Sequence, residues 1–265
     1  MPRDLSDVLH YFGPELAEPK GSTEASAETR PHASGLPTTL PIVGVPIGER
    51  DVVRAAFTWN LAVEIARLGG RALVVSPDET TPSPLWPVPG PGPLGVELRP
   101  TLAKDLESLQ KAALEAATAK VRGETEGGLV FVRIPPAWLE TSASAPALMD
   151  WTLLFTSSAT SDLREALRLA RAVMARRSGA RVGVTIHGVH CRSEAETAFE
   201  RVARATRRKP GSDVTSYGLL VDDLQVYRAI VAQRPIGLAH PQSPAARALR
   251  DVAQLLLDDG GKGSL

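Results

Sequence analysis

Short aliphatic runs alternate along this chain with longer segments in which apolar residues recur every three or four positions. The short runs predict buried strands at residues 41–45, 71–75, 128–134, 151–156, 181–186 and 216–221. The longer segments predict helices at residues 51–68, 102–121, 162–177, 193–207, 225–233 and 243–257. Strands that alternate with helices predict an α/β fold, with a doubly wound, mostly parallel sheet and helices on both of its faces.

The sequence also marks one helix start and one long loop. Ser193 and Glu196 have the spacing of a capping box, which predicts the beginning of the helix at residues 193–207. Residues 80–95 hold a dense cluster of prolines around Trp86. Because proline removes a backbone donor and fixes φ, this stretch is predicted to be a loop without regular structure.

The N-terminal 38 residues differ in composition from the rest of the chain. Apolar residues recur there at helical spacing and predict one short amphipathic helix: Leu5, Val8, Leu9 and Phe12. Residues 18–37 are rich in Ser, Thr, Glu, Ala, Gly and Pro, which predicts a flexible linker. We therefore divide the chain into residues 1–38 and a single α/β domain at residues 39–265. The helix, within residues 1–14, either docks on a protein partner or packs on its own domain.

Composition excludes several kinds of site. The 265 residues include 30 Lys and Arg and 30 Asp and Glu, so net charge indicates no particular partner. Cys191 is the single cysteine, which excludes a disulfide within the chain and fits a reducing cytoplasm. The irregular spacing of His187, His190 and Cys191 predicts no metal site. The sequence shows no secretory signal, no apolar run of about 18 residues and a polar, acidic C-terminus, so no membrane association is expected.

Two parts of the chain resemble MinD/ParA-type P-loop ATPases. The stretch at residues 54–78 is similar to the first helix and second strand of that family, with Asn60, Leu61 and Ala62 in the family's Asn-Leu-Ala position. Residues 200–256 resemble the FlhG or FleN branch, which controls flagellum number and placement. That likeness is carried by four short pieces: Tyr217-Gly218, Val221-Asp222-Asp223, Gln233-Arg234-Pro235 and residues 241–246. The resemblance covers residues 40–257 and implies a P-loop NTPase fold.

The family's phosphate-binding loop is degenerate in this chain. In the family, glycines allow backbone N–H groups to cradle the phosphates of ATP. The corresponding stretch here is residues 48–55, where Gly48 is the only glycine left. Arg50, Asp51 and Val53 stand where the family has glycines, and their side chains hinder both positive φ angles and close approach of a phosphate.

The charged and metal-binding positions of this loop have also changed. Glu49 replaces a lysine that reaches across the family's dimer, and Arg54 replaces the lysine that contacts the β- and γ-phosphates. Ala55 has no hydroxyl to hold Mg²⁺. Asp78 is the surviving aspartate of the family's Asp-Ala-Asp motif, and Arg133 stands at the Walker-B carboxylate. We expect no ATP hydrolysis from these residues, because they lack the groups that position and neutralise the phosphates.

Alternative interpretations remain for the arginines. Arg54 and Arg133 either form a residual anion site, or are solvated or paired with Glu49 and Asp51, and Asp78 is interpreted as a turn residue. Between Arg164 and Lys209 there are 12 Arg and Lys against 4 Asp and Glu, an excess of 8 positive charges. ParA proteins bind DNA through basic surfaces, so weak DNA binding is one interpretation. The other interpretation is that these arginines lie on solvated helix faces.

These observations lead to three hypotheses. The leading one is a non-catalytic pseudo-ATPase that needs no cofactor and acts as a protein-interaction or scaffold module in cell polarity, flagellum or motility placement, or segregation. The second is a divergent nucleotide-binding switch that uses ATP and Mg²⁺. The third is a non-specific DNA-binding protein. The family dimerises across bound ATP, so without that ligand a dimer of the same kind is not expected, and a dimer of another kind stays open.

Overall fold

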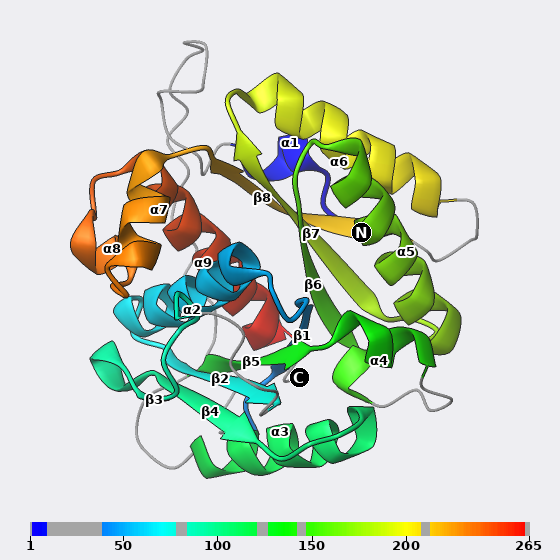
Figure 1. Ribbon diagram of the computed structural model, residues 1–265. Helices are drawn as coiled ribbons and strands as arrows, with labels where there is room; N and C mark the ends of the chain where they lie inside the picture. Colours follow the sequence, from blue (N-terminus) through cyan, green and yellow to red (C-terminus); the bar gives the residue numbers. More distant parts are fainter. Residues whose placement is uncertain are drawn as a thin grey trace.

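The computed structural model describes residues 2–9, 39–77, 84–120, 127–141, 147–207 and 213–262 (Figure 1). Its centre is an eight-stranded sheet in the order β3-β4-β2-β5-β1-β6-β7-β8. Neighbouring strands are parallel, except that β3 and β4 pair antiparallel. The strands are β1 (Ile42–Pro46), β2 (Arg71–Pro77), β3 (Gly90–Pro91), β4 (Glu97–Thr101), β5 (Gly128–Ile134), β6 (Trp151–Thr156), β7 (Arg181–Val189) and β8 (Val214–Val221). The predicted fold class is confirmed.

Helices cover both faces of the sheet, as right-handed connections between parallel strands require. α2 and α9 pack together on one face with α7 and α8 beside them, whereas α3, α5 and α6 lie on the other face with α4 against α5 (Figure 1). The helices are α1 (Leu5–Val8), α2 (Val52–Arg67), α3 (Leu106–Lys120), α4 (Pro136–Thr141), α5 (Thr160–Arg176), α6 (Arg192–Thr206), α7 (Leu224–Val231), α8 (Ile236–Ala239) and α9 (Pro244–Lys262). Two 3₁₀ turns are η2 (Pro93–Gly95) and η3 (Ala147–Met149).

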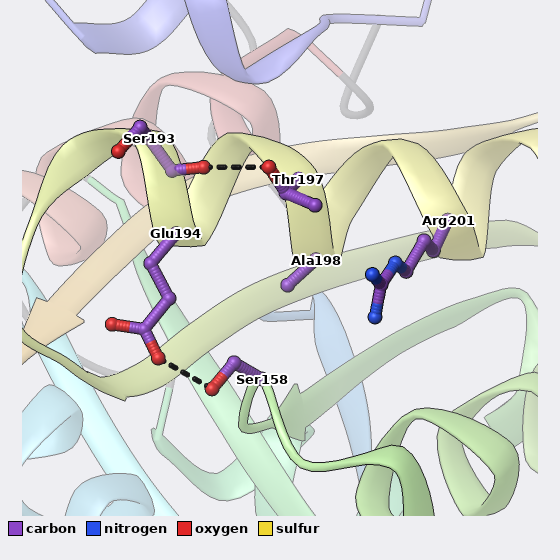
Figure 2. A pocket seen from close by; sticks show the side chains of 6 residues that line it. All are labelled: Ser158, Ser193, Glu194, Thr197, Ala198 and Arg201. Atoms are coloured by element: carbon purple, nitrogen blue, oxygen red, sulfur yellow. Dashed lines mark hydrogen bonds between the residues drawn. The ribbon is translucent and has the colours of Figure 1, made fainter.

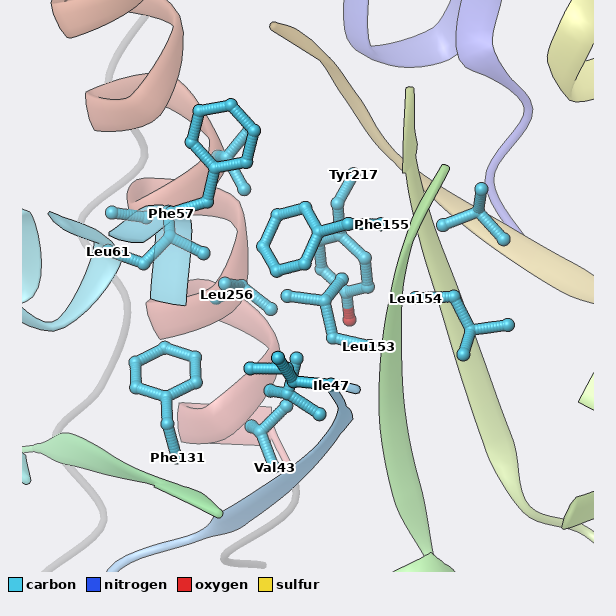
Figure 3. Close-up of a cluster of buried hydrophobic side chains, with 14 of the residues drawn as sticks. Val43, Ile47, Phe57, Leu61, Phe131, Leu153, Leu154, Phe155, Tyr217 and Leu256 are labelled. Atoms are coloured by element: carbon cyan, nitrogen blue, oxygen red, sulfur yellow. The ribbon is translucent and has the colours of Figure 1, made fainter. Parts of the chain in front are cut away.

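The core between the sheet and the pair α2 and α9 fixes the position of α2 (Figure 3). Phe57 and Leu61 of α2 are buried there, and the ring of Phe57 lies 5.7 Å from that of Phe155 on β6. Leu256 of α9 is buried in the same cluster. Because these apolar contacts position α2, its first turn is held at the carboxyl end of β1.

The proline-rich loop contains more regular structure than the sequence predicts. The prediction of no regular element at residues 80–95 is wrong, because β3 and η2 lie within it and β4 follows directly. Gly92 N–H donates to the carbonyl of Val96 at 2.7 Å, which closes the turn between the two strands. Gly90 and Gly95 have φ angles of +118° and +73°, which side chains rarely adopt. Glycines among the prolines therefore allow a tight hairpin.

The predicted capping box at α6 is also wrong. α6 begins at Arg192 with Cys191 as N-cap, and no side chain caps it. Glu196 pairs instead with Arg192 at 2.8 Å. Glu194 accepts a hydrogen bond from the N–H of His190 at 2.9 Å, so a different glutamate satisfies a backbone donor near this helix start.

α1 packs on the chain's own domain. Its apolar residues are buried in the common core against β8 and α6: Leu5, Val8 and Leu9. Ser216 N–H on the edge strand β8 donates to the carbonyl of Arg3 at 3.0 Å, and the Arg3 side chain pairs with Asp259 of α9. Of the two interpretations of this helix, packing on its own domain is the one observed. The division at residue 38 therefore does not separate α1 from the domain, and Phe12 lies outside the described residues.

Candidate functional site

Residues 47–51 connect β1 to α2 at the carboxyl edge of the sheet, where α/β folds bind their ligands. Within this loop, Asp51 N–H donates to the Gly48 carbonyl and Val52 N–H donates to the Arg50 carbonyl, both at 3.1 Å. Glu49 and Arg50 are exposed. A phosphate-binding loop presents its N–H groups to the ligand, whereas two of these N–H groups are used inside the loop.

Asp51 occupies the N-terminus of α2. Its carboxylate caps the helix by accepting a hydrogen bond from Arg54 N–H at 2.9 Å. Burial raises the pKa of Asp51 above its usual value, although the hydrogen bond and the positive charge of Arg54 act in the opposite direction. The positive end of a helix is a ready anion site. In this chain, a carboxylate of the protein itself fills that position.

Arg54 joins two helices through its guanidinium group. The side chain is buried, with Nε 3.1 Å from Asp51 and Nη1 3.0 Å from Glu165 on α5. The predicted pairing with Asp51 is confirmed, but the second carboxylate is Glu165 and not the exposed Glu49. The next residue, Ala55, is buried and offers no hydroxyl. Arg54 is thus neutralised by carboxylates of its own chain.

His187 lies beside this ion pair at the end of β7. Its ring centroid is 5.4 Å from that of Phe57, and its Nε2 has no hydrogen-bond partner among the described residues. Burial, helped by the charge of Arg54, lowers the pKa of His187 to about 4, so the ring is neutral at pH 7. Burial alone would raise the pKa of neighbouring Asp162, but hydrogen bonds from Ser157 and Ser161 hold it below its usual value.

Arg133 fills the space at the end of β5. The side chain is buried, and its guanidinium carbon lies 4.6 Å from the centre of the Trp86 ring. It also donates to the Ser76 hydroxyl and to the Ile47 carbonyl, both at 3.5 Å. The cavity that remains among these residues measures about 10 Å³, which is at most the room needed by one water molecule. These contacts of Arg133 are with Trp86, Ser76 and Ile47, and none of them involves Glu49 or Asp51.

A second hollow lies between the β6–α5 loop and α6 (Figure 2). Its volume is about 320 Å³, and it is lined by the hydroxyl residues Ser158, Ser193 and Thr197 together with Glu194, Ala198 and Arg201. Glu194 already accepts a hydrogen bond from Ser158 at 2.6 Å, and this bond and the one from His190 lower its pKa. The carboxylate is thus engaged within the protein, and the hollow presents no group activated for catalysis.

Solved structures with the same arrangement of strands and helices identify the fold. The MinD cell division protein of Aquifex aeolicus matches 82% of this chain and 97% of its own, with a TM-score of 0.59 and 16% identity. A ParA family ATPase from Chlorobium tepidum matches over 83% of this chain and 99% of its own chain, with a TM-score of 0.57 and 11% identity. The chain has the MinD/ParA P-loop ATPase fold. The complex of MinC and MinD from Aquifex aeolicus also matches, with a TM-score of 0.58, 15% identity and coverage of 82% and 96%. No protein-family model and no curated protein sequence matches the chain.

At the loop between β1 and α2, carboxylates and a ring of the protein itself lie where the resemblance places ATP and Mg²⁺. The helix N-terminus that would face a phosphate is capped by Asp51, and the buried cation Arg54 is paired with two carboxylates. A phosphate there would lie against Asp51, and like charges at short distance repel. Trp86 and Arg133 fill the neighbouring space. We therefore assign no step of chemistry to a nucleotide at this site.

The sequence located part of this site and missed the rest. The loop positions Gly48 to Ala55 and Arg133 lie at the carboxyl edge as expected, whereas Asp78 lies outside the described residues. Glu165 and Trp86 were not identified as members of the site. Glu165 is 111 positions from Arg54, and no spacing rule links residues so far apart. The hydrophobic pattern of α5 does place Glu165 beside the buried positions 163 and 166, which is the one available signal.

The basic segment between Arg164 and Lys209 is less positive in the structure than in the sequence. Several of its arginines form ion pairs: Arg168 with Glu140, Arg177 with Asp150, Arg192 with Glu196, Arg204 with Glu200 and Arg207 with Asp213. Three of these carboxylates, at positions 140, 150 and 213, lie outside the segment, so the sequence count did not include them.

Among the helices that the structure describes, none combines the length and the apolar character that a membrane-spanning helix needs.

Proposed function

We propose that this chain is a non-catalytic pseudo-ATPase that acts as a protein-interaction or scaffold module, works without ATP, and belongs to systems that place structures in the cell. Cell polarity, flagellum or motility placement, and segregation are the processes that its FlhG-like sequence features suggest. One observation carries the proposal: Arg54 is bound by Asp51 and Glu165 at the position where the fold binds phosphate. This internal ion pair replaces the ligand.

We expect this chain to bind a protein partner without binding a nucleotide. One neighbour of this fold, MinD of Aquifex aeolicus, is known in a complex with MinC. Protein partners are therefore plausible for a chain of this shape. In this chain, the ion pair joins the N-terminal turns of α2 and α5 without a nucleotide, so the edge of the sheet where they meet is expected to stay the same with and without ATP.

Calorimetry tests the proposal directly. ATP, ADP and GTP are titrated into the purified full chain with and without Mg²⁺, and hydrolysis of ATP is measured in parallel. We expect no binding heat at micromolar concentrations and no phosphate release above background. Micromolar binding would instead support the divergent switch. Hydrolysis that disappears in Arg54→Ala but persists in Arg204→Ala, a control at an exposed ion pair, would refute the proposal.

DNA binding remains the third candidate, and the same protein can test it. Because three arginines of α5 and α6 are paired with carboxylates, namely Arg168, Arg192 and Arg204, we expect little retention on DNA at physiological salt. Retention that falls steeply with added salt would support the DNA-binding alternative.

A further inference from the structure

α7 is apolar on two faces although it lies at the surface. Val226 and Ala229 are buried against the domain, as expected for a surface helix. Leu224, Tyr227 and Val231 are also apolar or aromatic, yet they remain 61%, 49% and 67% exposed. Their spacing of three and four residues places them along one stripe of the helix. A helix that is apolar on both faces is normally buried on both, so this stripe lacks a partner within the described residues.

A groove runs beside this stripe. It lies between α2, the proline-rich loop and the end of α7, has a volume of about 170 Å³, and is lined by Trp59, Pro87, Val88, Ile230 and Gln233 among others. Ile230 is the neighbour of Val231 and lies one helical turn from Tyr227, so groove and stripe form one apolar surface. Val88 is 67% exposed on the opposite rim. We call this surface the α7 groove.

The walls of the α7 groove are held in place. Gln233, at a positive φ of 53°, donates from Nε2 to the carbonyl of Pro84 at 2.9 Å and so links the end of α7 to the proline-rich loop. A Cβ on Gly92 would lie 2.5 Å from the Trp59 ring, which shows how closely the loop is packed on α2. The groove is therefore preformed, which reduces the entropic cost of binding.

Both charged residues of α7, of α8 and of the segment between them are arginines, whereas Asp222 and Asp223 precede Leu224 at the far end of α7. Residues 84–96 contain no charged residue, and residues 224–239 contain Arg228 and Arg234 alone. Both arginines are exposed, and neither has an ion-pair partner among the described residues. Arg234 lines the groove, and Arg228 lies one helical turn from Leu224 beside the stripe. An apolar surface with these two cations complements a segment that carries apolar side chains on one side and carboxylates at its flanks.

We infer that the α7 groove binds an amphipathic helical segment of a partner protein, with acidic residues placed against Arg228 and Arg234. This inference rests on the proposed function and assigns the surface that would carry it. The groove is smaller than the pockets of about 300–1,000 Å³ that enclose small molecules. Its concave form admits side chains at helical spacing, as in helix-in-groove recognition. A lipid surface offers no such side chains to fill a concavity.

A selection from phage-displayed random 16-residue peptides on the immobilised full chain tests the inference. We expect the enriched peptides to contain apolar residues at helical spacing and more Asp and Glu than Lys and Arg. A synthetic peptide of the enriched sequence should then lose at least about tenfold in affinity with Val231→Asp or Arg228→Glu, the size expected at an interface hot spot. Leu114→Asp is the matched control, because Leu114 is 41% exposed on α3, on the other face of the sheet.

Four results would overturn the inference: no enrichment, a basic consensus, equal binding by Val231→Asp, or an effect of Leu114→Asp as large as that of Val231→Asp. Sedimentation equilibrium adds a further test, since a dimer that Val231→Asp dissociates would assign the groove to a second copy of the chain. Binding to phosphatidylserine–phosphatidylcholine vesicles that Val231→Asp abolishes would assign it to a membrane. An ATP titration on the same preparation keeps the two proposals apart. Nucleotide binding with intact peptide binding refutes only the proposed function.

Discussion

Replacement of Arg54 by methionine should destabilise the chain, because it leaves two neighbouring carboxylates without the cation that they share. Methionine retains an unbranched apolar stem of similar length while removing the guanidinium that bridges Asp51 and Glu165. Removing one partner of a fully buried ion pair costs about 3–5 kcal/mol. Asp51 and Glu165 keep 26% and 35% of their side chains exposed, so water will relieve part of this cost. We expect the free energy of unfolding to fall by about 2 kcal/mol.

Urea unfolding followed by circular dichroism at pH 7 measures this loss, which corresponds to a decrease in Tm of about 4–8 °C for a chain of roughly this size. Arg204→Met is the matched control, because Arg204 and Glu200 are 80% and 63% exposed, and such a pair contributes less than about 1 kcal/mol. If Arg54→Met and Arg204→Met cost the same, the bridge does not join α2 to α5 as described.

The same variant has a second, independent readout. The positive charge of Arg54 helps to lower the pKa of His187, so this pKa should rise in Arg54→Met. Titration of the imidazole signals by NMR follows the change. A His187 pKa that stays at the wild-type value would mean that the guanidinium does not lie beside the ring, and the argument for the ion pair would fail with it.

Three further predictions follow from buried groups. His187 has a pKa of about 4 in the folded chain against 6.5 in the unfolded one, so stability is present above pH 6.5 and is lost as the pH falls toward 4. The loss is at most about 3 kcal/mol, and His187→Gln should remove that part of the pH dependence in urea unfolding. In Gly237→Ala, the new Cβ would lie 1.7 Å from Oε1 of buried Glu64, so we expect the free energy of unfolding to fall by about 1–3 kcal/mol. Gly48→Ala is the control, because its Cβ has open space around it, and it should unfold at nearly the wild-type urea concentration. Trp86→Ala should lower the free energy of unfolding by about 3 kcal/mol, because it leaves a cavity where the ring was packed. Trp86→Phe should lower it clearly less, and equal losses would contradict the packing of this ring.

The central strands could be predicted because burial on both faces leaves a simple pattern. β5 and β6 are buried at every position, so their sequences are nearly continuous apolar runs. β4 could not be predicted in this way. It lies near the edge of the sheet, where Glu97 and Arg99 pair with each other at 3.0 Å in partly exposed positions, and it includes Pro100. A strand with two charges and a proline does not carry the pattern of a buried strand.

The candidate site could be predicted in position but not in its interactions. The resemblance to the MinD/ParA loop placed Arg54 at the start of a helix, because the aliphatic strand before it and the periodic helix after it are both evident. Which carboxylates neutralise Arg54 depends on how α2 and α5 are placed on the two faces of the sheet, and that is decided by the whole core. The stacking of Trp86 on Arg133 likewise depends on the glycine-supported hairpin that the prolines concealed.

The two buried arginines near the loop between β1 and α2 both have partners within the chain. Removing the partner of a buried charge costs about 3–5 kcal/mol, and an aromatic ring stacked on a desolvated guanidinium contributes about 2 kcal/mol. In this chain, Arg54 has two carboxylates and Arg133 has Trp86. The ion pair links α2 to α5, and the stacking links β5 to the proline-rich loop, so both connections are made by the chain's own side chains. Two of the elements that form the α7 groove are α2 and the proline-rich loop. Because both are held by internal contacts, the groove is expected to present one fixed shape to its partner, and ATP should leave the peptide affinity of the full chain unchanged.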